Sequence, residues 1–187
     1  MKLLICITGM PGSGKSIIAK AATDLKLPVV NMGDVVREET LKRYGVIEPD
    51  LMRKVSADLR REFGNRIIAI RTLEKIKDID DPIIVVDGVR SLEEIDVFKS
   101  HGNVVIIAIH ASPKTRFERI RRRGRPGDPD NWDDFWRRDL VELSFGIGYV
   151  IALADYMIVN EGSIEEAYKR AREILERLKQ DVCKGKS

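Results

Sequence analysis

The chain has 187 residues, 43% of them hydrophobic, which is the length and apolar content of one ordinary domain. Its 33 basic and 30 acidic residues leave a formal net charge of only +3, so bulk charge gives no indication of a nucleic-acid partner. The two cysteines fit neither a disulfide framework nor a metal cluster, and no stretch approaches the roughly 18 uninterrupted apolar residues of a membrane span, so we expect a cytoplasmic protein with neither a membrane nor a nucleic-acid partner.

A glycine-rich loop follows the first apolar run, residues 3–7, and precedes residues 17–22, which have helical spacing. The loop is Gly9-Met10-Pro11-Gly12-Ser13-Gly14-Lys15-Ser16. Strand, glycine loop and helix in this order are typical of a phosphate-binding loop. Glycines let successive backbone N–H groups face a polyphosphate, Lys15 adds a cation, and the Ser16 hydroxyl can hold Mg²⁺. We therefore expect these eight residues to bind ATP with Mg²⁺; a glycine turn that binds nothing is the alternative.

A short strand at residues 29–31 follows Pro28, and two runs at helical spacing lie between it and the Asp80-Asp81-Pro82 break. Residues 32–78 are therefore interpreted as a helical insertion between the second strand and the next.

Asp87 ends the next apolar run, residues 83–86, which is typical of a central parallel strand beside the phosphate loop. A carboxylate at this place can reach the Mg²⁺ shell, although an ordinary Asp-Gly turn is the alternative. Arg90 lies at the same edge of the predicted sheet, where a guanidinium can grip a second phosphate. The alternative for Arg90 is a solvated arginine at the start of a helix.

A second helical region follows the apolar strand at residues 104–109. Ser112 and Pro113 predict the cap and first residue of a helix through about Arg123, and residues 124–130 are too rich in glycine and proline to be helical. We expect an exposed, mobile loop there and a return to helix from about residue 131. Eight arginines lie in this region: Arg116, Arg119, Arg121, Arg122, Arg123, Arg125, Arg137 and Arg138. Taken by itself, such a run of arginines is most simply interpreted as a solvated basic helix.

Residues 156–159 predict the last strand, and a Ser163–Glu166 capping box predicts the start of the final helix. Five strands alternating with helices predict a three-layer α/β fold, in which a parallel sheet carries helices on both faces and ligands bind at the carboxyl ends of the strands. We expect a single P-loop domain with its core at residues 1–31 and 79–187, the insertion at 32–78 and an arginine-rich lid at 121–138.

The combination of these segments resembles the P-loop nucleoside monophosphate kinase family, adenylate kinase above all. It consists of Gly9–Ser16, then Gly33-Asp34 with Arg37, then Asp87-Gly88 with Arg90, then the arginine-rich lid. The resemblance implies that Gly33, Asp34 and Arg37 contact the acceptor, with a capped helix start at Asp34 as the alternative. It also implies that lid arginines stabilise the charge of the transferred phosphoryl group, Arg119 and Arg123 first. Arg138 comes second, because Arg138-Asp139 is expected to reopen the helix after the loop.

The C-terminal part differs from adenylate kinase. Residues 154–163 are similar to dephospho-coenzyme A kinases, in which the loop after this strand borders the adenine of ATP. That similarity implies Asn160 and Gly162 near the base, and a simple turn into the capped helix is the alternative. Val89 stands before Arg90, where adenylate kinases usually have proline, and the lid lacks the cysteines of the zinc-stapled form. The combination of these motifs most resembles a largely archaeal group of adenylate-kinase-related proteins.

These observations predict a Mg²⁺- and ATP-dependent kinase that moves the γ-phosphoryl group to a small phosphorylated acceptor, most simply a nucleoside monophosphate. Lys15 is expected on the β- and γ-phosphates, Ser16 and Asp87 on the metal, and Arg37 and Arg90 on the acceptor. A hydroxyl acceptor, with Asp34 or Asp87 as the base, is one alternative. A nucleotide-binding regulator with little turnover is the other. The sequence determines neither the acceptor nor the oligomeric state.

Overall fold

A single five-stranded sheet forms the centre of the computed structural model, which describes residues 2–184. Its strands are β1 (Lys2–Thr8), β2 (Val29–Asn31), β3 (Ile83–Asp87), β4 (Gly102–His110) and β5 (Tyr156–Val159). Every neighbouring pair is parallel, in the order β2-β3-β1-β4-β5. The chain therefore starts in the central strand, winds to one edge and then crosses to the other, which confirms the doubly wound fold.

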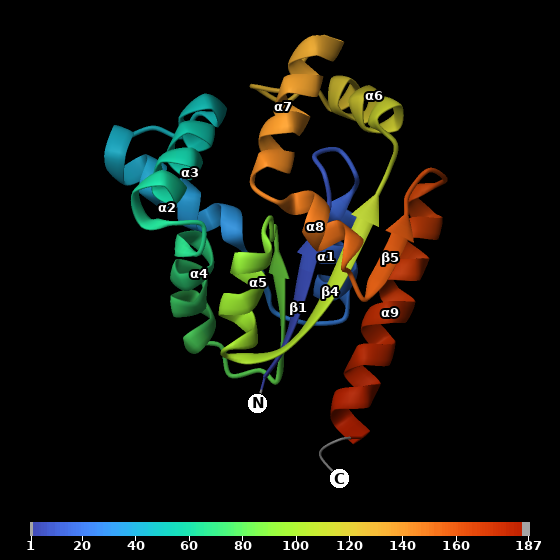
Figure 1. Ribbon diagram of the computed structural model, residues 1–187. Coiled ribbons are helices and arrows are strands. Elements are labelled where there is room, and N and C mark those ends of the chain that lie inside the picture. Colours follow the sequence, from blue (N-terminus) through green and yellow to red (C-terminus); the bar gives the residue numbers. More distant parts are fainter. Residues whose placement is uncertain (1, 185–187) are drawn as a thin grey trace.

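Helices cover both faces of the sheet (Figure 1). The helices α1 (Lys15–Asp24) and α9 (Ile164–Lys184) pack on one face, against Leu3, Ile5 and Ile7 of β1. The helices α4 (Ile67–Lys77), α5 (Leu92–Lys99) and α8 (Ile147–Ala152) pack on the other, against Leu4 and Cys6. Successive side chains of a strand point to opposite faces, so burial on both sides requires the continuous apolar runs that the sequence shows.

Three helices lie between β2 and β3: α2 (Met32–Tyr44), α3 (Pro49–Phe63) and α4. This segment, residues 32–78, is called the insertion below. The start of α2 differs from the alternative in which Asp34 caps the helix. The Asn31 side chain accepts a hydrogen bond from the Gly33 N–H at 2.7 Å, so the helix begins at Met32 and Asp34 lies inside its first turn. Asparagine and aspartate are both good caps, and the one that directly follows the strand caps the helix.

The segment called the lid below consists of α6 (Pro113–Arg123), an exposed loop and α7 (Trp132–Ser144), which lie above the carboxyl ends of β1 and β4 in Figure 1. It extends beyond the expected residues 121–138 at both ends. Asn131 caps α7 by accepting from the Asp134 N–H at 2.9 Å. The expectation that Arg138-Asp139 reopens the helix was therefore wrong, because Arg138 lies in the middle of α7. The Ser163–Glu166 capping box is confirmed by reciprocal hydrogen bonds. Between residues 2 and 184, no helix has both the length and the apolar character that crossing a membrane requires.

Candidate active site

The loop at residues 9–16 connects β1 to α1 in a conformation that only glycine adopts without strain. Gly12 and Gly14 have φ values of +81° and +107°. A Cβ at Gly12 would lie 2.9 Å from the Arg116 carbonyl oxygen, and one at Gly14 would lie 2.5 Å from the Asn160 Nδ2. Left-handed backbone and close neighbours both exclude side chains here. Lys15 begins α1, and its Nζ donates to the Gly9 carbonyl at 2.5 Å.

Asn160, which directly follows β5, supports this loop. Its buried side chain donates from Nδ2 to the Ser13 carbonyl at 2.8 Å, and its backbone N–H donates to His110 at 2.7 Å. The residue expected near the base of ATP thus has its side chain on the phosphate loop. A residue that immediately follows the edge strand can reach the loop because parallel strands end at the same edge.

Asp87 lies beside the loop, because β3 pairs with β1 and places Asp87 opposite Ile7. Burial raises the pKa of the Asp87 carboxyl, and the charges of Lys15 and Arg90 oppose that rise. Burial also lowers the pKa of Lys15 to about 8, partly offset by the charge of Asp87. The two charged groups expected around a phosphate therefore titrate away from their ordinary ranges in opposite directions.

Polar atoms around the loop are withdrawn from solvent without a hydrogen-bond partner in the described part of the chain. They are Ser13 Oγ, Asp87 Oδ1 and Arg119 Nη1. Buried polar groups are normally paired, so such orphans mark a place where a ligand completes the hydrogen bonding. The hydroxyl and the guanidinium can donate hydrogen bonds to phosphate oxygens, and the carboxylate oxygen can bind a cation. Together they fit a polyphosphate with its cation. Ser16, the other expected metal ligand, is exposed at the start of α1.

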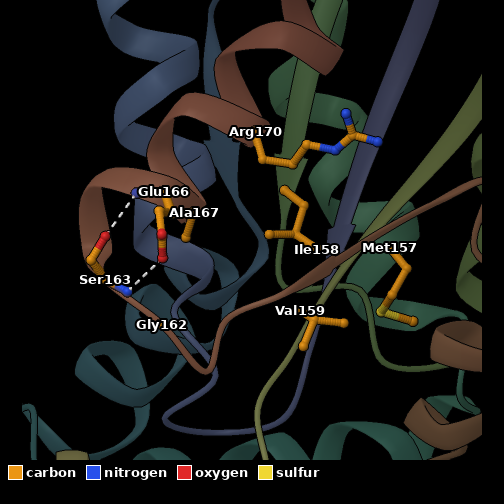
Figure 2. A pocket seen from close by; sticks show the side chains of 8 residues that line it. All are labelled: Met157, Ile158, Val159, Gly162, Ser163, Glu166, Ala167 and Arg170. Atoms are coloured by element: carbon orange, nitrogen blue, oxygen red, sulfur yellow. Dashed lines mark hydrogen bonds between the residues drawn. The ribbon is translucent and has the colours of Figure 1, made fainter.

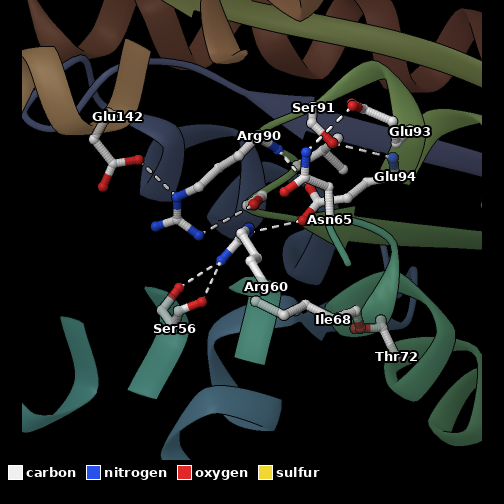
Figure 3. A network of polar contacts seen from close by, with 12 residues as sticks. Ser56, Arg60, Asn65, Ile68, Thr72, Arg90, Ser91, Glu93, Glu94 and Glu142 are labelled. Atoms are coloured by element: carbon white, nitrogen blue, oxygen red, sulfur yellow. Dashed lines mark hydrogen bonds and ion pairs between the residues drawn. The ribbon is translucent and has the colours of Figure 1, made fainter. Parts of the chain in front are cut away.

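Arg90 lies in a polar network that sequence reasoning did not foresee (Figure 3). Its Nε donates to Glu142 Oε2 of α7 at 2.7 Å, and its backbone N–H donates to Glu94 Oε2 of α5 at 2.7 Å. Glu94 is fully buried and also accepts from Arg60 Nη2 of α3 at 2.8 Å. Arg60 in turn lies over the ring of Phe145, 4.7 Å from its centroid. The network therefore joins the insertion, the core and the lid.

The three lid arginines expected to act on the phosphoryl group have different partners. Arg119 approaches Asn160 Oδ1 at 3.4 Å. Arg123 and Arg138 both bind the carboxylate of Asp128 in the lid loop, at 2.6 Å and 3.2 Å. Burial alone would raise the pKa of Asp128, but these arginines lower it to about 2. Arg123 and Arg138 are thus gathered at one carboxylate, while Arg119 lies at Asn160, the residue that contacts the phosphate loop.

Arg116 was counted among the lid arginines without a role of its own, and the structure buries it. Its guanidinium makes a bidentate pair with Asp139 of α7 at 2.8 Å and 2.5 Å, and it also donates to the Pro11 carbonyl at 3.2 Å. The signal was present in α7, where Phe135, Asp139 and Glu142 are spaced on one helical face. Two acids on the face of a buried phenylalanine predict inward-pointing ion pairs.

A cavity of about 710 Å³ lies between the insertion and the lid. Gly33, Met52 and Phe145 line it, together with Arg90 and Glu142 at the end nearest the core. Of the four expected acceptor residues, Gly33 and Arg90 are brought to this cavity. The other two lie outside it: Asp34 and Arg37 form a surface pair at 3.8 Å, and both side chains are more than half exposed.

The tips of the two parts meet at the rim of this cavity. A Cβ at Gly127 of the lid loop, where φ is +76°, would lie 2.6 Å from the Pro49 Cβ at the start of α3. Arg53 of α3 also donates to the Gly127 carbonyl at 3.4 Å.

A smaller hollow of about 280 Å³ lies between β5 and α9 (Figure 2). Gly162 is the one expected site residue that lines it, beside the Ser163–Glu166 capping box and Arg170. Gly162 therefore lies at the outer edge of the sheet, while its neighbour Asn160 faces the phosphate loop.

Comparisons with known proteins agree with this architecture. A family model described as an AAA domain matches residues 8–135. A UPF0200 protein of Staphylothermus marinus is 60% identical, covering 100% of this chain and 99% of that protein. A UPF0200 protein of Methanocaldococcus jannaschii is 47% identical, covering 98% and 94%.

Solved structures share the fold at low sequence identity. TT1252 of Thermus thermophilus has a TM-score of 0.64 at 19% identity, covering 95% of this chain and 98% of that one. Shikimate kinase of Bacteroides thetaiotaomicron has a TM-score of 0.59 at 17% identity, covering 93% and 98%. These similarities show a P-loop kinase fold and nothing finer.

Proposed function

Because the chain belongs to the UPF0200 family and to the AAA-domain family, and has the fold of a P-loop kinase, we propose that it transfers the γ-phosphoryl group of ATP to a small acceptor. One observation carries the proposal: the phosphate loop and the cavity share a cluster of charges. Lys15 and Asp87 of the loop side interact with Arg90 and Glu142, which line the cavity. A donor at the loop and an acceptor in the cavity would meet at this cluster.

The donor end is formed by residues 9–16, whose backbone would surround the phosphates while Lys15 binds the β- and γ-phosphates. Ser16 and Asp87 would hold Mg²⁺, which when bound neutralises charge on the phosphate oxygens. The orphaned Asp87 Oδ1 and Arg119 Nη1 support this assignment, because both lack a partner within residues 2–184. Arg119 would complete its hydrogen bonding on the ATP phosphates.

The acceptor end is the cavity beside Arg90, and a nucleoside monophosphate is the first candidate. An oxygen of its phosphate would form the new bond to the γ-phosphorus as the bond to ADP breaks and the electron pair stays on ADP. A phosphate is already ionised near neutral pH, so this transfer needs no general base. Arg123 and Arg138 would stabilise the moving charge after exchanging Asp128 for the phosphoryl oxygens.

A hydroxyl-bearing acceptor is a second candidate, and two observations favour it. Glu142 already neutralises Arg90, and Arg37 lies outside the cavity, so neither of the two arginines expected on the acceptor is free to bind a phosphate there. Burial also raises the pKa of Asp87, which suits a base that takes the hydroxyl proton as the oxygen attacks.

The deciding experiment measures ADP release from MgATP with each nucleoside monophosphate and, separately, with nucleosides, shikimate and dephospho-coenzyme A. The product would be assigned by ³¹P NMR, and Lys15→Ala is the control that removes donor binding while leaving the fold intact. A phosphoanhydride product supports the first candidate, and a phosphomonoester supports the second. If no acceptor raises ADP release above background while ATP still stabilises the fold, the kinase proposal fails and a nucleotide-binding regulator becomes the better account.

A further inference from the structure

Glu142 is the lid residue that pairs with Arg90, three residues after the end of β3. It lies on α7, its carboxylate accepts from Arg90 Nε at 2.7 Å, and its side chain is only 15% exposed (Figure 3). Burial would raise the pKa of Glu142, but the charges of Arg90, Lys15 and Arg138 lower it. A charged carboxylate therefore stands among three cations of the proposed transfer site.

The backbone of Arg90 is held in place without Glu142. Its backbone is already held by Glu94, which is itself fixed by Arg60 and by the Ser91 cap of α5. A guanidinium presents five donors in a planar fork that matches a carboxylate or a phosphate. Glu142 accepts one of these guanidinium hydrogen bonds, from Arg90 Nε. Both residues line the cavity, so the bond lies where an acceptor would bind.

We propose that Glu142 is a specificity-determining residue that occupies the place of the acceptor's anionic group on Arg90. This inference rests on the proposed transfer to a phosphorylated acceptor. A neutral ligand leaves the Arg90–Glu142 pair intact and gains no ionic contact. A phosphate monoester carries a charge of about −1.5 to −2 and three acceptor oxygens, so it can displace a singly charged carboxylate. Glu142 thereby sets how much negative charge an acceptor must bring in order to bind at Arg90.

The test compares wild type with Glu142→Gln, each saturated with Mg²⁺ and the non-hydrolysable analogue AMP-PNP so that the phosphate loop is filled. Binding of AMP, adenosine and inorganic phosphate is measured by calorimetry. We expect Glu142→Gln to bind AMP and phosphate about tenfold more tightly, because the competing charge is gone, and to bind adenosine as wild type does. Unchanged or weaker binding of both anions would overturn the inference.

Control variants separate competition at Arg90 from a general loss of negative charge. Glu39→Gln removes the same charge from a pair with Arg43 and Arg71 outside the cavity, and should leave AMP binding unchanged. Glu142→Asp keeps the charge and should stay closer to wild type than to Glu142→Gln. Arg90→Lys combined with Glu142→Gln should lose most of the gain; an equal gain without Arg90 would also contradict the inference.

The failure of the proposed function would be distinguishable from the failure of this inference. Turnover by wild type with unchanged anion affinity in Glu142→Gln would remove the inference alone. Tighter anion binding in a protein that never transfers phosphate would remove the kinase proposal and leave the charge competition in place.

Discussion

Burial and charge set the titration of single residues around the phosphate loop. Lys15 and Asp87 face each other across the site, and each is pushed toward its neutral form by burial. A polyphosphate reverses that effect for the lysine, because an anion favours the charged form.

We therefore expect the affinity for MgATP to fall as pH rises above about 8, by up to about tenfold per pH unit, since Lys15 must take up a proton on binding. Stability of the free protein should change the opposite way. Lys15 has a pKa of about 8 in the folded protein and its ordinary value of 10.5 in the unfolded chain. The unfolded chain therefore binds more protons between these values, and stability rises with pH there.

Calorimetry from about pH 7 to pH 9.5 checks the binding part of this prediction. Lys15→Arg, which stays protonated, should bind ATP with little pH dependence. A wild-type dissociation constant that is constant over this range would contradict the assignment of Lys15 to the phosphates.

Asn160 provides a second prediction at the residue scale. Asn160→Ala leaves the buried Ser13 carbonyl without its 2.8 Å donor, so we expect a loss of about 1–3 kcal/mol in the free energy of unfolding and weaker ATP binding. Urea unfolding and ATP titration measure the two effects. Asn103→Ala, at an exposed position of β4, is the control and should change neither. Full ATP affinity in Asn160→Ala would show that the loop holds its shape without this support.

The strands were largely predictable from the sequence, and the partners of the charged residues were not. Continuous apolar runs fixed β1, β3 and β4 to within about two residues, since buried parallel strands need apolar side chains on both faces. The lid pairs Arg90–Glu142 and Arg116–Asp139 join residues 52 and 23 positions apart, so no local pattern contains them. The phosphate loop was predictable because its chemistry lies in consecutive residues.

At the scale of elements, Arg116 and Asp139 join α6 to α7 through a pair whose side chains are only 3% and 5% exposed. Asp139→Ala leaves a buried guanidinium without its partner, so we expect a loss of about 3–5 kcal/mol in the free energy of unfolding. The double variant Arg116→Met with Asp139→Leu should recover most of that loss, because apolar groups of similar volume need no partner.

Urea unfolding distinguishes these outcomes. Arg137→Ala removes an exposed pair with Asp134 on the same helix, and should cost less than about 1 kcal/mol. If Asp139→Ala cost no more than Arg137→Ala, the buried pair would not hold the lid helices together.

At the scale of the whole molecule, the insertion and the lid both extend beyond the carboxyl edge of the sheet and meet over one cavity. Ligands bound to both halves should close these parts further. We expect tryptic cleavage after Arg123, at the start of the lid loop, to slow several-fold when AMP-PNP and an acceptor are present together, and less with either alone. Equal cleavage in all states would contradict a closing lid.

The close approach of Gly127 to Pro49 has a consequence for how fast a ligand can enter and leave the cavity. Pro49 begins α3 and Gly127 lies in the lid loop, and both residues line the cavity. We expect a ligand of the cavity to be retained while this contact lasts and to leave when it breaks. If the proposed function holds, the dwell time of acceptor and product depends on how often these two residues part, at a contact next to Asp128, the carboxylate that Arg123 and Arg138 bind.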